Sequence, residues 1–70
     1  MRKKLPRIAL NIKKYRERLG ISQDKLSKLA GVTVHTLTKI ESGATSDPRI
    51  ETLKNIADAL GVGVDDLIGA

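Results

Sequence analysis

The chain has 70 residues, no cysteine, a single aromatic residue (Tyr15) and a formal net charge of +5. Without disulfides, so small a domain depends on one efficiently packed core, and its aliphatic, highly charged composition favours a helical bundle over a small β-barrel. No apolar run approaches the about 20 residues needed to span a bilayer, and no apolar signal-peptide segment follows the basic start. Because missing cysteines fit a reducing compartment, we expect a cytoplasmic protein.

The charges are distributed unevenly along the chain. Residues 1–40 contain eleven Lys or Arg and two acids, a net charge of +9, whereas residues 41–70 contain two Lys or Arg and six acids, a net charge of −4. This polarity favours a polyanionic partner for the first part. A solvated surface with a basic tail is the plain alternative. An anionic membrane is a weaker one, since the first predicted helix has no broad apolar face to insert.

The predicted elements begin with a basic arm, residues 1–7, ahead of a domain over residues 8–68. A first helix is expected from about Pro6 to Leu19, since proline is tolerated at a helix start. Its apolar stripe consists of Ile8, Ile12, Tyr15 and Leu19. Ser22 is the expected N-cap of a second helix, which ends at Gly31. The apolar positions of this second helix are Leu26, Leu29 and Ala30.

Thr33 is the expected N-cap of a third helix over residues 34–41, with Leu37 and Ile40 on one side. The opposite face consists of Val34, His35, Thr38 and Lys39. These four side chains are not needed by the core that the helical period predicts. The face therefore raises the question of what it contacts.

A fourth helix is expected after Asp47 as N-cap and Pro48 as its first residue. Its apolar stripe consists of Ile50, Leu53, Ile56, Ala57 and Leu60. A short fifth helix in "VDDLIG" carries Leu67 and Ile68, and Gly63 in place of a Ser or Thr cap predicts fraying. The expected core consists of Leu26, Ala30, Val32, Leu37, Ile40, Leu53, Ile56, Ala57 and Leu60. The predicted fold class is all-α, a compact bundle of five short helices.

The run "GISQDKLSKLAGVTVHTLTKIESG", followed by "DPRIETLKNIADALGVGVDDLI", resembles the Cro/C1-type helix-turn-helix family, the DNA-binding domains of lambdoid phage repressors. The matching positions within residues 8–68 are Gly20, Ser22, Gln23, Leu26, Gly31, Ile40, Glu41, Gly43, Pro48, Leu53, Ala57, Leu60, Gly61, Val62, Asp66 and Leu67. The resemblance implies a lambda-repressor-like fold with its helix-turn-helix at the second and third helices. It also implies sequence-specific binding of double-stranded DNA by a small transcriptional regulator.

In this family the third helix, here residues 34–41, is the recognition helix in the major groove. The resemblance therefore predicts base readout by Val34, His35, Thr38 and Lys39. Their chemistry agrees, because valine can touch a thymine methyl, histidine and threonine can bond base edges, and lysine can reach guanine O6 and N7. The open alternatives are a Val34 side chain folded back onto the turn, and solvated side chains at His35 and Lys39.

The resemblance also implies contacts that grip or position. Phosphate contacts are expected from Gln23, Thr33, Arg49, Arg2, Lys3 and Lys4. The resemblance also implies that Gln23 braces the recognition helix. The loop "ATSDP" lacks the basic residues that are frequent in the family at this place. We therefore expect the phosphate contacts to come from the arm, from Arg7 and from the first helix. Arg16 and Glu41 occupy positions that form an ion pair in the family. Ordinary surface roles remain open for Gln23, Arg16 and Glu41.

No enzyme site is expected. His35 is the only histidine and has no cysteine to join it at a metal, and the chain lacks a glycine-rich phosphate loop. We therefore expect no cofactor and no metal. The expected partner is double-stranded DNA, which a homodimer binds at a two-fold operator. No membrane partner is expected. Two other functions stay open: a protein-binding adaptor or antitoxin with an unidentified protein partner, and a non-specific nucleic-acid binder.

Overall fold

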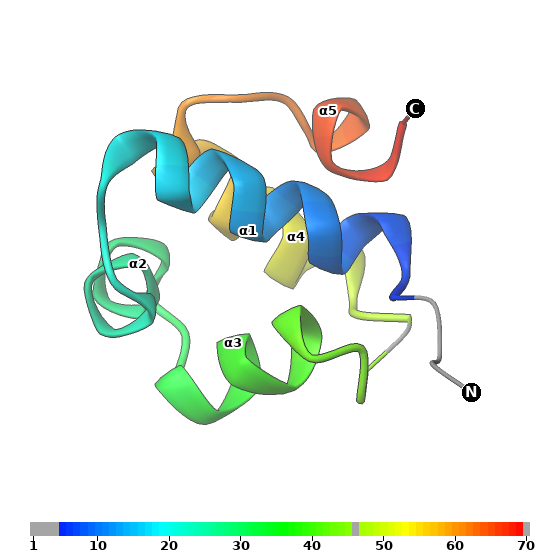
Figure 1. Ribbon diagram of the computed structural model, residues 1–70, viewed down its shortest axis with the longest axis horizontal. Coiled ribbons are helices and arrows are strands. Elements are labelled where there is room, and N and C mark those ends of the chain that lie inside the picture. The colour runs from blue at the N-terminus through cyan, green and yellow to red at the C-terminus, as the bar shows by residue number, and fades with distance from the viewer. Residues whose placement is uncertain (1–4, 46, 70) are drawn as a thin grey trace.

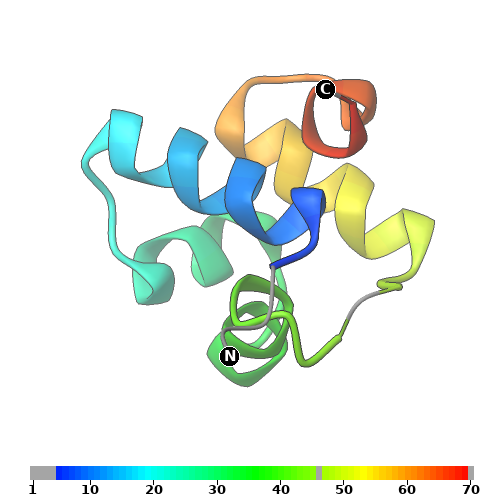
Figure 2. The ribbon, with the colours of Figure 1, turned by 45° about the vertical axis from the view of Figure 1, so that its right-hand side comes forward.

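The computed structural model describes residues 5–45 and 47–69, which form five helices and no strand. The helices are α1 (Arg7–Leu19), α2 (Gln23–Ala30), α3 (Val34–Glu41), α4 (Ile50–Leu60) and α5 (Val64–Ile68). In Figures 1 and 2, α3 and α5 lie at opposite ends of the molecule, with α1 and α4 between them. The predicted all-α fold is confirmed. Among the described residues, no helix is both long and apolar enough to cross a membrane.

One apolar core joins all five helices. Its fully buried large side chains are Ile12, Leu26, Leu37, Ile40, Ile56 and Leu67. The other buried members of this core are Ala30, Leu53, Ala57 and Leu60. The expected core is therefore confirmed except at Val32, which is only partly buried and packs against the edge of the cluster. Ala9, which the sequence did not single out, is also buried.

Four apolar residues that were named in the expected helices are exposed. Their exposed fractions are 54% for Leu19, 54% for Leu29, 68% for Ile50 and 48% for Ile68. Leu19 and Ile50 lie at the ends of α1 and α4, where fewer neighbours cover a side chain. In α2 the buried side chains are Leu26, Ser27 and Ala30, so the core lies on the Ser27 side of Leu26. Leu29, on the other side of Leu26, is turned to solvent.

The start of α4 also differs from the prediction. The helix begins at Ile50 after an extended Arg49 that makes no side-chain cap, so the expected Asp47 cap and helical Pro48 were wrong. Pro48 is partly buried and lines a hollow with Ile40 and Thr52. The backbone therefore stays extended past the proline to carry the chain from the end of α3 to α4.

The short helix α5 is held at both ends. Its N-terminal side is closed by the Asp66 carboxylate, which accepts a hydrogen bond from the backbone N–H of Gly63 at 2.9 Å. At its C-terminal side, the Asn11 side-chain amide donates to the carbonyl oxygens of Leu67 at 2.7 Å and Gly69 at 3.3 Å. These bonds satisfy backbone groups that a helix end leaves unpaired. The predicted fraying at Gly63 is therefore opposed by contacts that the missing Ser or Thr cap did not reveal.

Candidate nucleic-acid interface

A tight turn of residues 31–33 joins α2 to α3. Gly31 takes the left-handed conformation, with φ of +70°, and the next backbone N–H, of Val32, bonds the Ser27 carbonyl at 3.0 Å. The Thr33 hydroxyl oxygen then accepts from the Thr36 N–H at 3.1 Å, which caps α3. This cap fixes the direction in which α3 leaves the turn, and the core contacts of α3 fix its rotation.

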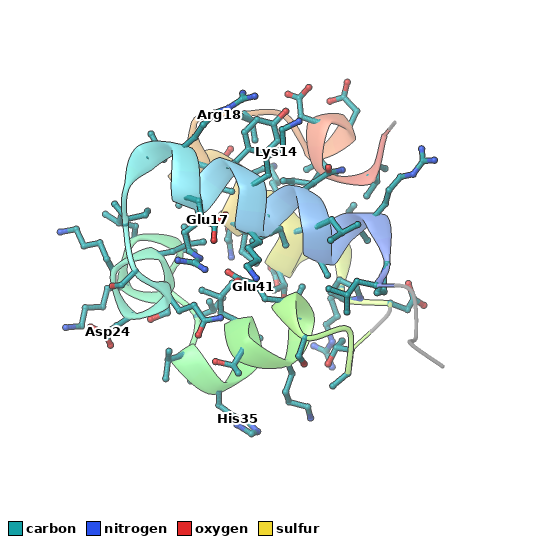
Figure 3. All side chains as sticks on the ribbon, viewed as in Figure 1. Lys14, Glu17, Arg18, Asp24, His35 and Glu41 are labelled. Carbon is teal, nitrogen blue, oxygen red and sulfur yellow. The ribbon has the colours of Figure 1, made fainter. Side chains whose placement is uncertain are left out.

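The four residues predicted to read bases share the free face of α3. Val34 is 43% exposed, and His35, Thr38 and Lys39 are also exposed. Figure 3 shows His35 projecting away from the rest of the molecule. Val34 is therefore one of the exposed large apolar residues, unlike Leu37 on the other side of the helix. We call these four residues the outer face of α3.

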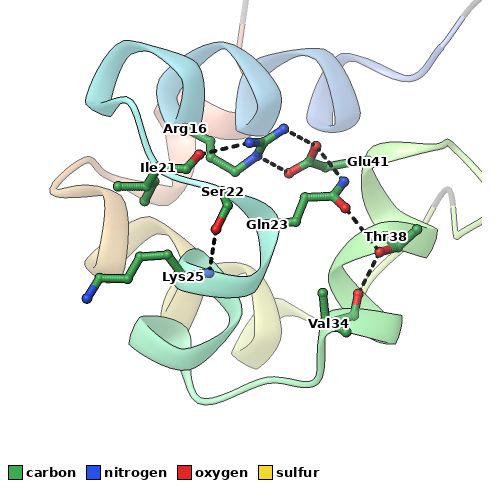
Figure 4. Close-up of polar contacts among 8 residues, drawn as sticks. All are labelled: Arg16, Ile21, Ser22, Gln23, Lys25, Val34, Thr38 and Glu41. Atoms are coloured by element: carbon green, nitrogen blue, oxygen red, sulfur yellow. Dashed lines mark hydrogen bonds and ion pairs between the residues drawn. The ribbon is translucent and has the colours of Figure 1, made fainter.

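Behind this face, Arg16 of α1 and Glu41 of α3 form an ion pair (Figure 4). Arg16 Nε donates to Glu41 Oε2 at 2.8 Å and Nη2 donates to Oε1 at 3.1 Å, a two-bond geometry that favours both affinity and orientation. Only 13% of the Arg16 side chain and 4% of the Glu41 side chain are exposed. The hydrogen bond to Glu41 raises the pKa of Arg16, against the lowering effect of burial. Arg16 therefore stays charged.

Arg16 also holds the turn that precedes α2, because its Nη1 donates to the carbonyl oxygen of Ile21 at 2.9 Å. Gln23, the first residue of α2, extends this polar network. Its Nε2 donates to Glu41 Oε1 at 3.1 Å, and its Oε1 accepts from the Thr38 hydroxyl at 3.3 Å. One network of side chains thus joins α1, the turn after it, α2 and α3.

The other predicted phosphate-contacting residues lie around α3 or outside the described chain. Thr33 is exposed at the start of α3, and Arg49 is exposed at the start of α4. An open hollow separates these helices, lined by Thr36, Ile40, Thr45, Asp47, Pro48, Arg49 and Thr52. The expected contacts at Arg2, Lys3 and Lys4 fall outside the described residues. Leu5 and Pro6, which follow them, lie beside Gly43 just past α3.

Not all of the basic charge lies near α3. Figure 3 shows Lys14 and Arg18 of α1 in the half of the molecule away from His35. The Arg18 guanidinium lies 5.6 Å from the centre of the Tyr15 ring, a distance at which a cation and an aromatic face attract. These two residues therefore do not share the side of the molecule that carries His35. Within residues 5–45 and 47–69, no three His, Cys, Asp or Glu residues gather as metal ligands would.

Comparison with known proteins identifies the class that this geometry defines. The helix-turn-helix family matches residues 12–67, from α1 into α5, and the chain belongs to this family. The resemblance to Cro/C1-type proteins is thereby confirmed. The HTH-type transcriptional regulator SlrR of Bacillus subtilis (strain 168) is 36% identical over 59 residues. The match covers 84% of this chain but 39% of SlrR, so the chain spans well under half the length of that relative.

Proposed function

We propose that this chain binds double-stranded DNA sequence-specifically, as a small transcriptional regulator in the cytoplasm, with α3 in the major groove. The observation that carries the proposal is the outer face of α3. Four side chains able to contact bases project from a helix whose other face is fixed by Leu37 and Ile40 in the core. Membership of the helix-turn-helix family and the likeness to a transcriptional regulator support the same function.

Base readout on this proposal falls to the outer face. Lys39 reaches guanine O6 and N7, His35 bonds a base edge, and Val34 touches a thymine methyl. The Thr38 methyl group can make a similar apolar contact, since the Thr38 hydroxyl already bonds within the protein at 2.7 Å from the Val34 carbonyl oxygen. Discrimination among base pairs then depends on the side chains that α3 presents together.

Phosphate contacts on this proposal surround the recognition helix. Thr33 and Arg49 occupy the starts of α3 and α4, where unpaired backbone N–H groups and positive partial charge favour an anion. Gln23 Nε2 carries two hydrogens. It donates one to Glu41, so the other can be donated to a phosphate oxygen. Arg2, Lys3 and Lys4 add charge from the arm. These contacts set register and affinity without specifying sequence.

A single recognition helix contacts few base pairs, so we propose that two copies occupy a two-fold operator. Half-sites would then lie about 34–36 Å apart, one turn of the duplex. This dimer on DNA would double the number of bases read. Neither copy needs an enzymatic group or a cofactor for that task.

The test is selection of bound sites from random duplex DNA, performed with the chain and with two Lys→Ala variants of equal charge. We expect an enriched two-fold consensus, which Lys39→Ala weakens and Lys14→Ala leaves intact, because Lys14 lies in the half of the molecule away from His35. Retention of DNA without enrichment would instead indicate a non-specific binder. Failure to retain DNA would point to a protein-binding adaptor or antitoxin. An enriched consensus without two-fold symmetry would contradict the dimer.

A further inference from the structure

We infer that Thr38 acts in DNA recognition as a positioning residue, whose hydroxyl orients the Gln23 side chain and links the outer face of α3 to the Arg16–Glu41 ion pair. This inference rests on the proposed function and revises one part of it. On geometry, Thr38 belongs to the outer face, but its hydroxyl faces two acceptors inside the protein. Figure 4 shows these contacts.

The Thr38 hydroxyl is committed as a donor. Its oxygen lies 2.7 Å from the carbonyl oxygen of Val34, one helical turn earlier, and 3.3 Å from Gln23 Oε1. A hydroxyl has one hydrogen, so it donates to one of these acceptors at a time. Donation to guanine or to adenine N7 would require leaving both. The oxygen could still accept a bond from an adenine or cytosine amino group, and the experiment below separates that possibility.

The orientation of the Gln23 amide follows from its other neighbour. The Glu41 carboxylate is paired with Arg16 and, when ionised, offers only acceptors, so the amide must turn its Nε2 toward it. Gln23 Oε1 is then directed at Thr38. Reversing the amide would place Oε1 against the carboxylate and the amide N–H groups against the hydroxyl. The contact with the carboxylate is the unfavourable one, because a hydroxyl oxygen can also accept from an N–H, so Glu41 sets the orientation of the amide and Thr38 holds its Oε1 end.

This arrangement matters for binding because it fixes the start of α2 relative to the middle of α3. Gln23 is the first residue of α2, and Thr38 lies 15 residues later on the opposite side of the turn. Fixing the Gln23 amide also fixes the direction of its second N–H, which is proposed to meet a phosphate. Ordering such a group before binding lowers the entropy lost on binding. The expected effect of Thr38 is on affinity and not on the choice of bases.

The experiment compares variants of similar shape in binding and in site selection. Thr38→Val keeps the branched side chain and removes the hydroxyl, whereas Thr38→Ser keeps the hydroxyl and removes the methyl. We expect Thr38→Val to weaken binding to the selected site about three- to tenfold, the range for one neutral hydrogen bond, and to leave the consensus unchanged. Thr38→Ser should stay close to the parent. In a Gln23→Met background, Thr38→Val should have almost no further effect.

Other outcomes overturn the inference. Relaxed preference at one base pair, of equal size with and without Gln23, would make Thr38 a base reader. A larger loss from Thr38→Ser than from Thr38→Val would assign the effect to the methyl group. Unchanged binding by Thr38→Val would remove any role for the hydroxyl. Thermal unfolding of each variant controls for loss of fold.

A measurement on the free protein keeps this inference separate from the proposed function. Thr38→Val should shift the NMR resonances of the Gln23 side-chain amide, because the hydroxyl that donates to its Oε1 is lost, while Lys39→Ala should not. Unmoved Gln23 resonances would overturn the network even if DNA binding is established. Shifted resonances together with no selected DNA site would support the network and contradict the proposed function.

Discussion

The two faces of α3 differ in what holds their side chains. On the inner face, Leu37 is 0% exposed, Ile40 is 1% and Glu41 is 6%. On the outer face, His35 and Lys39 are exposed to solvent. The inner residues are needed to fold the domain, since each fills the core or completes a polar network. The outer residues are free to be chosen for a partner, which makes this face informative about function.

Two polar residues connect the faces. Glu41 lies among buried side chains yet carries a charge, which Arg16 balances, and Thr38 lies on the outer face yet bonds toward the interior. Gln23 stands between them. The difference between the two faces is therefore largest between Leu37, which serves the fold, and Lys39, which is proposed to serve binding. Substitutions in the polar network that connects the faces should affect both folding and binding.

The largest effect is expected on the inner face. Leu37→Ala removes a fully buried side chain and leaves a cavity, which should lower the free energy of unfolding by about 2–5 kcal/mol. A domain of this size has little stability to spare, so the variant should be largely unfolded near physiological temperature. Urea or thermal unfolding measures this. Lys39→Ala, the matched outer substitution, should change stability by less than about 0.5 kcal/mol. Equal effects of the two variants would contradict the assignment of the faces.

The second effect concerns the polar residue of the inner face. Glu41→Leu leaves the Arg16 charge mostly buried and without its partner, and should lower the free energy of unfolding by about 2–4 kcal/mol. Arginine remains protonated in proteins, so it cannot escape by losing its charge. Adding Arg16→Met should restore part of the loss. A double-mutant cycle by urea unfolding measures the coupling, and a coupling near zero would mean that the two residues act independently.

Much of the fold could be predicted from the sequence, because periodicity alone identifies the inward direction of a helix when its apolar residues agree. In α3, Leu37 and Ile40 lie on the same side of the helix, so only one rotation of the helix buries both. In α2, the apolar pattern predicted that Leu29 faces the core, whereas the structure buries the smaller Ser27. The packing of the neighbouring helices determines which of the two is buried. The start of α4 was misplaced because Asp47 and Pro48 form a good local start signal, which the path from α3 overrode.

The candidate site was predictable to a similar depth. The outer face followed from the same helical period, and the resemblance to a known family supplied the pairing of Arg16 with Glu41. The resemblance implied that Gln23 braces the recognition helix, but it did not identify Thr38 as the partner, since the bond joins residues 15 apart through side-chain rotamers. Asn11 was missed for the same reason, as its partners lie 56 and 58 residues away at the end of α5.

The third prediction tests the outer face. Lys39→Ala should remove about 1–3 kcal/mol of binding free energy on the selected site and relax preference at one base pair, while sparing random DNA. By contrast, replacing both Lys3 and Lys4 by Ala should weaken selected and random DNA alike, because phosphate contacts carry no sequence information. Titrations of both duplexes at several salt concentrations measure this. If Lys39→Ala weakens both DNAs equally, Lys39 is a phosphate contact and base readout rests with Val34 and His35.

The smallest effect is expected at Arg49, where a capping residue would stabilise the fold but a basic residue would favour DNA binding. Arg49 is the N-cap of α4 but makes no capping bond, whereas Ser22 and Thr33 cap α2 and α3 at 3.1 Å. Arg49→Ser should supply the missing cap and raise stability by about 0.5–1 kcal/mol. It should also remove a phosphate contact, which makes the negative slope of log affinity against log salt concentration less steep by about 0.9.

Arg49→Lys provides the control for this last prediction, because it keeps the charge and adds no cap. It should therefore retain the salt dependence and leave the melting temperature near that of the parent. A more stable Arg49→Ser variant with weaker binding would show that arginine stands at this helix start for its partner and not for the fold. An unchanged salt dependence would instead place Arg49 outside the interface and confine the phosphate grip to α2, α3 and the basic arm.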